Sequence, residues 1–183
     1  MQNADKHDDI DFFVITKKNT LWLTRLLLIF VLKLIGRHRG RLDRKVSNKV
    51  CLNMIMEESK LEFGKERQDL YTAHEIVQIV PLFQRESTYS RFISANEWVG
   101  KYLANASELT QDKKIWKKKK KTKAAFNTPL LTALEFFAKK IQYWYIERHK
   151  THETISDKLL AFHPFDYREA VMQAYYKRLK KYG

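Results

Sequence analysis

The chain has 183 residues, of which 44% are hydrophobic, so it is long enough for one ordinary domain or two small ones. A hydrophobic fraction of that size excludes a wholly disordered chain. Lys and Arg outnumber Asp and Glu by 35 to 21, and the resulting net charge of +14 should attract phosphate groups and acidic surfaces. Only five Gly and three Pro are present, which favours a helix-rich fold over a sandwich or barrel.

The single cysteine and the start of the chain indicate the compartment. Cys51 is alone, which excludes an internal disulfide. The first residues are polar and acidic and do not resemble a cleavable signal peptide. Both features favour a reducing, cytoplasmic setting. Because Cys51 lies between Val50 and Leu52, we expect a buried thiol with no catalytic role.

The first two elements are a strand and a long apolar helix. The segment Ile10–Thr16 is rich in β-branched and aromatic residues and ends at a polar KKN, which predicts a buried strand. A helix should follow from about Thr20 to Ile35, ended by Gly36. A helix over Leu21–Ile35 covers roughly 22 Å, too short for a bilayer core of about 30 Å. We therefore expect a buried helix, with a membrane-associated protein anchored by this segment as the alternative.

The rest of the chain changes from strands to helices near residue 64. A second strand is predicted over KVCLNMIM and a third, shorter one over KLEF. Helices are then predicted from Asp69 to Pro81, over Ser87–Leu103, from Thr128 onward, and from Asp166, with Glu169 completing a capping box. The predicted fold is α+β, with a small mixed sheet in residues 1–64 and a helical domain in residues 65–183.

Two carboxylates at the start of the first strand are the strongest candidates for a chemical role. Asp9 and Asp11 are separated by one residue, so in an extended strand both side chains lie on the same face. Carboxylate oxygens are hard ligands that suit Mg²⁺ or Mn²⁺, and such an ion can neutralise charge during phosphoryl transfer. The pair therefore predicts a site for a divalent metal ion.

The surrounding sequence resembles the polymerase-β-like nucleotidyltransferases, in particular a bacterial nucleotidyltransferase-domain family. The resemblance covers most of the chain from Asp8 onward, and its blocks are DDIDFFVIT, LWLTRLLLIFVLKLIG, KVCLNMIMEE, DLYTAHEIVQIVPLF, RFISANEWVGKYLAN and SDKLLAFHPFDYREAVMQAY. It implies metal-dependent transfer of a nucleoside monophosphate from a nucleoside triphosphate such as ATP to a hydroxyl acceptor, with Asp9 and Asp11 as metal ligands.

The same resemblance implies a third carboxylate and a nucleotide-binding loop. A neighbouring strand often supplies the carboxylate, for which Glu62 is the candidate, while Glu57, Glu58 and Asn53 remain open alternatives. The family also carries a Gly-Ser motif before the acidic strand, and only MQNADKH precedes that strand here. We therefore expect that the chain is either part of a longer gene product or lacks the half that grips the nucleotide, and transfer by this chain alone is in doubt.

A second functional hypothesis comes from the basic run between Lys113 and Lys123. Runs of like charge are commonly solvated loops, and this is the favoured interpretation. The alternative is a basic, helical nucleic-acid-binding module in which this run contacts phosphates, and its binding would weaken steeply with salt.

Overall fold

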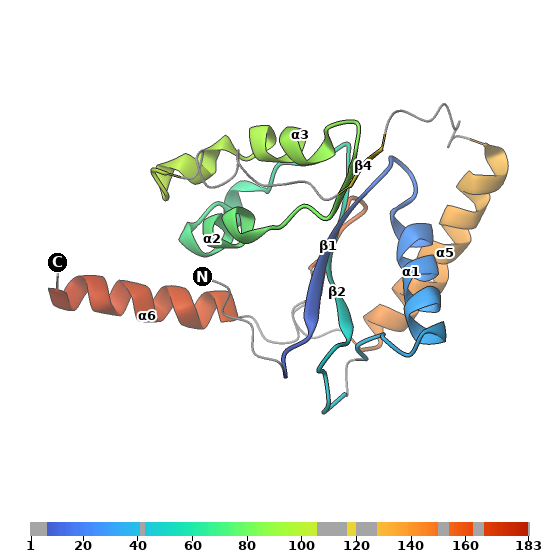
Figure 1. Ribbon diagram of the computed structural model, residues 1–183, viewed down its shortest axis with the longest axis horizontal. Coiled ribbons are helices and arrows are strands. Elements are labelled where there is room, and N and C mark those ends of the chain that lie inside the picture. The colour runs from blue at the N-terminus through green and yellow to red at the C-terminus, as the bar shows by residue number, and fades with distance from the viewer. Residues whose placement is uncertain are drawn as a thin grey trace. The chain divides into compact units, whose positions relative to one another are not determined.

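The computed structural model describes residues 7–40, 43–105, 117–119, 128–149, 154–162 and 167–182. The chain forms two compact units, and each unit contains residues from two separate parts of the sequence. Unit 1 consists of Met1–Ser59 and Ala125–Pro164, and unit 2 consists of Lys60–Ala124 and Phe165–Gly183. Strands and helices occur together, so the fold class is α+β, as predicted (Figure 1).

Unit 1 contains a four-stranded mixed sheet. Its strands are β1 (Ile10–Thr16), β2 (Val50–Glu57), β5 (Thr154–Ile155) and β6 (Leu159–Ala161), in the order β1-β2-β6-β5. β1 and β2 are parallel, whereas β6 is antiparallel to both of its neighbours. Parallel strands need a crossover connection, and the chain makes it through α1 (Leu21–Leu34). The first strand and the first helix are therefore confirmed.

Two helices cover one face of this sheet. α1 and α5 (Pro129–Glu147) lie side by side beside β1 and β2 (Figure 1). Thr128 caps α5 through the backbone N–H of Leu131, as its position before Pro129 predicted. The core between the helices and the sheet consists of Leu21, Trp22, Leu32, Val50, Leu52, Ile55, Ala138, Ile146 and Leu160.

A partly buried polar contact holds α1 against α5. The hydroxyl of Thr20 does not cap α1 but donates to the carbonyl of Lys17 at 2.9 Å. The Glu135 carboxylate takes its place, accepting hydrogen bonds from the backbone N–H groups of Trp22 at 2.8 Å and Leu23 at 2.7 Å. A carboxylate at this position satisfies two unpaired donors and interacts favourably with the positive end of the helix dipole.

We predict that Glu135→Gln destabilises the protein by about 1–2 kcal/mol, because the amide retains only one acceptor and loses the charge beside the helix end. Urea unfolding followed by circular dichroism measures the change. Glu147→Gln is the matched control, since Glu147 is exposed on the same helix, and we expect a change below about 0.5 kcal/mol there. Equal effects at the two positions would contradict the capping role.

Unit 2 consists mainly of helices. Its elements are η1 (Lys65–Arg67), α2 (Leu70–Gln78), β3 (Phe83–Arg85), α3 (Thr88–Ala95), η2 (Glu97–Lys101), β4 (Lys117–Lys119) and α6 (Tyr167–Tyr182), with β3 and β4 parallel. Asp69 caps α2 by accepting from the Thr72 N–H at 2.9 Å, as predicted. Its second oxygen accepts from Arg168 of α6 at 2.5 Å. The capping box predicted at Asp166 lies outside the described residues.

The prediction of one helix over Ser87–Leu103 is wrong, because the helix breaks at Asn96. This side chain is buried, and its amide group donates to the carbonyls of Leu61 at 2.8 Å and Phe92 at 2.9 Å. Its carbonyl oxygen accepts from the Phe63 N–H and from the Trp98 indole, both at 3.0 Å. Asn96 thus uses its full hydrogen-bonding capacity to tie a separate segment to the break between α3 and η2.

We predict that Asn96→Ala lowers the free energy of unfolding by about 2–4 kcal/mol, because it leaves the Phe63 N–H and the Trp98 indole buried without an acceptor. Chemical denaturation monitored by tryptophan fluorescence provides the measurement. Asn105→Ala, at an exposed position of the same unit, is the control and should change stability by less than about 0.5 kcal/mol. A loss below about 1 kcal/mol for Asn96→Ala would contradict the assignment.

The two units divide the chain differently from the predicted boundary near residue 64. The first boundary, after Ser59, lies close to it, but residues 125–164 belong to unit 1 because β6 pairs with β2. The KLEF segment forms no strand: Leu61 and Phe63 are buried in unit 2, held by Asn96.

Of the run from Lys113 to Lys123, only the backbone of β4 is described. No helix of the described residues is both long and apolar enough to cross a membrane.

Candidate metal centre

The start of β1 places two carboxylates on the face of the sheet opposite α1 and α5. Phe12 and Val14 pack against the core under these helices. Side chains alternate between the faces of a strand, so Asp9 and Asp11 project from the other face. The structure therefore brings this predicted pair together on one side, and Asp11 remains exposed to solvent.

Cys51 completes a cluster with these two carboxylates. β1 and β2 are parallel, and their register places Asp11 directly opposite Cys51. One oxygen from each of Asp9 and Asp11 and the Sγ of Cys51 all lie within 4.8 Å of one another. The flanking apolar residues had predicted a buried thiol with no catalytic role, but Cys51 is only half-buried. Its position in the cluster follows from the strand register.

Arg39 is a fourth member of the site, which the sequence analysis did not find. The segment before β2 runs alongside the start of β2. The backbone N–H of Arg39 donates to the backbone carbonyl of Val50 at 3.0 Å, and the backbone N–H of Val50 donates to the backbone carbonyl of Arg37 at 2.7 Å. This pairing directs the Arg39 guanidinium to Asp9, where Nη1 lies 2.5 Å from Oδ2. Part of the negative charge of the cluster is thereby neutralised within the protein.

Two groups of the cluster, Asp11 and Cys51, have pKa values above their ordinary ranges. Desolvation raises the pKa of Asp11, and the charge of Asp9 raises it further. Burial raises the pKa of the Cys51 thiol to about 12, with Asp11 adding to the shift and Arg39 opposing it. A cation between these groups would stabilise their charged forms, because nearby positive charge lowers the pKa of an acid.

The donor atoms fit a divalent cation. Two carboxylate oxygens suit Mg²⁺ and Mn²⁺, which complete their coordination with water and substrate phosphates. The thiol is a softer donor, which Mn²⁺ tolerates better than Mg²⁺. With its pKa at about 12, Cys51 is a neutral thiol at pH 7. Asp9 and Asp11 are thus the residues that would hold the ion, with Cys51 beside it.

The candidates for a third carboxylate lie elsewhere. Glu62 is in unit 2, where its Oε1 accepts from Gln68 at 3.2 Å, and it does not belong to the Asp9–Asp11–Cys51 cluster. Glu57 lies at the opposite end of β2, paired in register with Thr16, and accepts hydrogen bonds from the Asn19 N–H and the Ser59 hydroxyl. Its neighbour Glu58 forms an ion pair with Lys17.

Asn53 is the remaining alternative, and it lies within β2. The backbone carbonyl of Asn53 accepts a hydrogen bond from the backbone N–H of Phe162 at 2.8 Å. The cluster of potential metal-binding groups found among the described residues contains neither Glu57 nor Glu58. The structure thus brings together two of the three carboxylates selected from the sequence, and the role of Glu62 stays a prediction.

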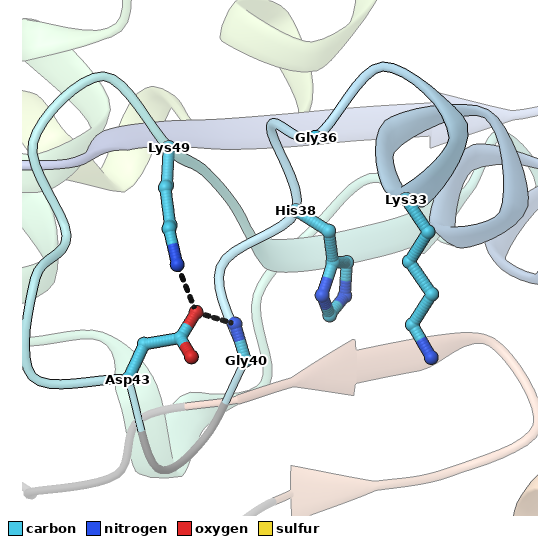
Figure 2. A pocket seen from close by; sticks show the side chains of 6 residues that line it. All are labelled: Lys33, Gly36, His38, Gly40, Asp43 and Lys49. Atoms are coloured by element: carbon cyan, nitrogen blue, oxygen red, sulfur yellow. Dashed lines mark hydrogen bonds and ion pairs between the residues drawn. The ribbon is translucent and has the colours of Figure 1, made fainter.

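A separate pocket lies beside the C-terminal end of α1. Figure 2 shows its lining by Lys33, Gly36, His38, Gly40, Asp43 and Lys49. Asp43 accepts from Lys49 at 2.6 Å and from the Gly40 N–H at 2.8 Å, so one lysine is already neutralised. Burial lowers the pKa of His38, and the charge of Lys33 adds to the shift, which favours a neutral ring at pH 7. The pocket therefore offers little net positive charge to an anion.

Comparisons of the chain with known protein families, with curated proteins and with solved structures found no match.

We predict that Cys51 reacts with iodoacetamide about 50-fold more slowly than a free thiol at pH 8 in metal-free buffer, because a pKa of about 12 removes most of the thiolate. The rate should rise steadily with pH above 9. Chain mass measured over time gives the rate at one position, since Cys51 is the single cysteine. The urea-unfolded chain is the control and should react like a free thiol.

Two substitutions should shift this rate in opposite directions. Asp11→Asn removes a negative charge that raises the pKa of Cys51, so alkylation should accelerate. Arg39→Gln removes a positive charge that lowers the same pKa, so alkylation should slow. Changes of the same sign in both variants would contradict the electrostatic account of the site.

Proposed function

We propose that this chain is a nucleotidyltransferase-like protein in which Asp9 and Asp11 bind Mg²⁺ or Mn²⁺. In this proposal the reaction transfers a nucleoside monophosphate from a nucleoside triphosphate to a hydroxyl acceptor. The observation that carries it is the convergence of both carboxylates and the Cys51 thiol, within 4.8 Å, on one face of β1. The block-by-block resemblance to polymerase-β-like nucleotidyltransferases supports the assignment to this chemistry.

Each residue of the cluster has a role in this proposal. Asp9 and Asp11 would hold the ion at the start of β1. Arg39 forms an ion pair with Asp9 that holds this carboxylate in place. A bound ion would supply charge neutralisation at the phosphates and would lower the pKa of the acceptor hydroxyl.

The reaction itself is a substitution at the α-phosphorus. The acceptor oxygen forms a bond to this phosphorus, the bond to the β-phosphate bridging oxygen breaks, and pyrophosphate leaves. In this proposal the proton of the acceptor hydroxyl passes to solvent water.

Metal binding is tested by titrating Mn²⁺ into the chain and following its electron paramagnetic resonance signal. We predict saturable binding to one site, weakened by about tenfold or more in the double variant Asp9→Asn, Asp11→Asn, because both charged ligands are lost. The control is Asp43→Asn with Asp157→Asn, which removes two carboxylates of unit 1 that form ion pairs with lysines and are not members of the cluster. Equal binding in both double variants would refute the site.

The position of the ion is tested with Cys51. Mn²⁺ bound between the carboxylates should change the alkylation rate of this thiol in the wild-type chain, but not in the Asp9→Asn, Asp11→Asn variant.

Transfer is then tested with ATP labelled at the α-phosphate in the presence of cell extract as a source of acceptors. Where this chain suffices for transfer, label should enter an acceptor with the wild-type chain and the control variant, and fail to do so with the double variant.

A further inference from the structure

The outer side of α1 is apolar and exposed. The sequence predicted a buried helix, but only one side of α1 faces the core. Leu27, Phe30, Val31 and Leu34 recur at three- and four-residue spacing, and their exposed fractions are 54%, 59%, 50% and 70%. Residues at this spacing form one continuous stripe along a helix. α1 therefore buries one side and presents the other, equally apolar side to solvent.

α5 carries a second stripe of the same kind. Leu130, Leu134, Phe137, Ile141 and Trp144 follow helical spacing and are exposed, while Ala138, Gln142 and Ile146 form the buried side. α1 and α5 lie side by side on one face of the sheet (Figure 1), so both stripes face away from the sheet. We call the two stripes together the outer helical face.

The outer helical face is large for a surface exposed to water. Aromatic side chains bury about 150–250 Å² each and aliphatic ones somewhat less, so nine side chains at roughly half exposure amount to on the order of 800 Å². The largest apolar patch on a typical monomer is about 300–600 Å². An area of this size indicates an apolar partner.

The charges around the outer helical face indicate the chemistry of that partner. α1 contains no acidic residue. The Glu135 carboxylate of α5 points inward to cap α1, and the exposed Glu147 keeps its charge but is outnumbered on α5 and its C-cap by the exposed Lys140 and Arg148. The cations are placed differently: Lys33 is exposed near the end of α1, and the Arg148 guanidinium lies 3.9 Å from the centre of the Trp144 ring. An apolar face bordered by cations complements a surface that is apolar inside and anionic at its edge.

We propose that the outer helical face binds the surface of an anionic lipid bilayer, with α1 and α5 lying in the plane of the membrane. The leucines, Phe30, Phe137 and Ile141 would enter the boundary of the acyl chains, while Trp144 lies at the level of the headgroups, where amphipathic rings are favoured. Lys33, Lys140 and Arg148 then contact anionic headgroups, each contributing through the negative surface potential.

An anionic bilayer explains the surface better than a second copy of the chain does. Two copies joined through this face would bring like charges together, because the borders of the face are basic and the chain carries a net charge of +14. The proposal does not depend on the metal centre, which lies on the opposite face of the sheet.

The test is flotation of the full chain with vesicles of phosphatidylcholine and with vesicles of phosphatidylcholine and phosphatidylglycerol in equal parts. We expect binding to the anionic vesicles and little binding to the neutral ones. The variant Phe30→Gln, Leu34→Gln, Phe137→Gln, Ile141→Gln should lower the partition coefficient by about tenfold or more, because four apolar side chains no longer enter the lipid. All four are exposed, so the variant should fold.

The matched control replaces four exposed apolar residues of unit 2 by Gln: Val80, Leu82, Val171 and Leu179. This control should bind anionic vesicles like the wild type. A second readout uses Trp144, whose fluorescence should shift to the blue on binding, with the shift reduced in Trp144→Phe. Equal partitioning of the two quadruple variants, or no binding by the wild type, would overturn the proposal. So would a dimer in light scattering without lipid that only the α1 and α5 variant dissociates, because it would assign the face to a second copy.

Discussion

The parallel pairing of β1 with β2 is the interaction on which the candidate metal centre depends. Its register sets Asp11 opposite Cys51, and the backbone of residues 37–39 continues the pairing alongside Val50. Four groups from three segments of the sequence thereby meet at one end of two strands. Parallel pairing also requires a crossover, and α1 provides it. A shift of the β1–β2 pairing register by one residue would move the carboxylates to the other face of the sheet. The cluster would then no longer form.

The two faces of this sheet have different chemistry because side chains alternate along β1. On one face, partly desolvated carboxylates and a thiol with a pKa of about 12 lie around the Arg39 guanidinium. On the other face, the same strand contributes apolar side chains to the core under α1 and α5. The candidate metal centre and the outer helical face therefore lie on opposite faces of the sheet, and a substitution in one should leave the other unchanged.

Buried polar groups determine where the helices of each unit lie. Glu135 caps α1 from α5, and Asn96 joins the segment before η1 to the break between α3 and η2. Each contact satisfies several backbone groups at once, so its loss would leave buried donors without partners. The two contacts connect residues far apart in the chain. They hold the elements in place more specifically than apolar packing alone, which tolerates shifts.

The sequence by itself determined the local elements of this protein: the strand Ile10–Thr16, the helix that follows it, the Asp69 and Thr128 caps, and the placement of Asp9 and Asp11 on one face. These depend on residue spacing and on capping chemistry, which act between near neighbours. Only the tertiary structure decided that Cys51 and Arg39 join the carboxylates, that Glu62 lies in the other unit, and that residues 125–164 return to the first sheet. The reason is that strand pairing and burial of a helix depend on contacts between distant segments, whose register no local pattern in the chain specifies.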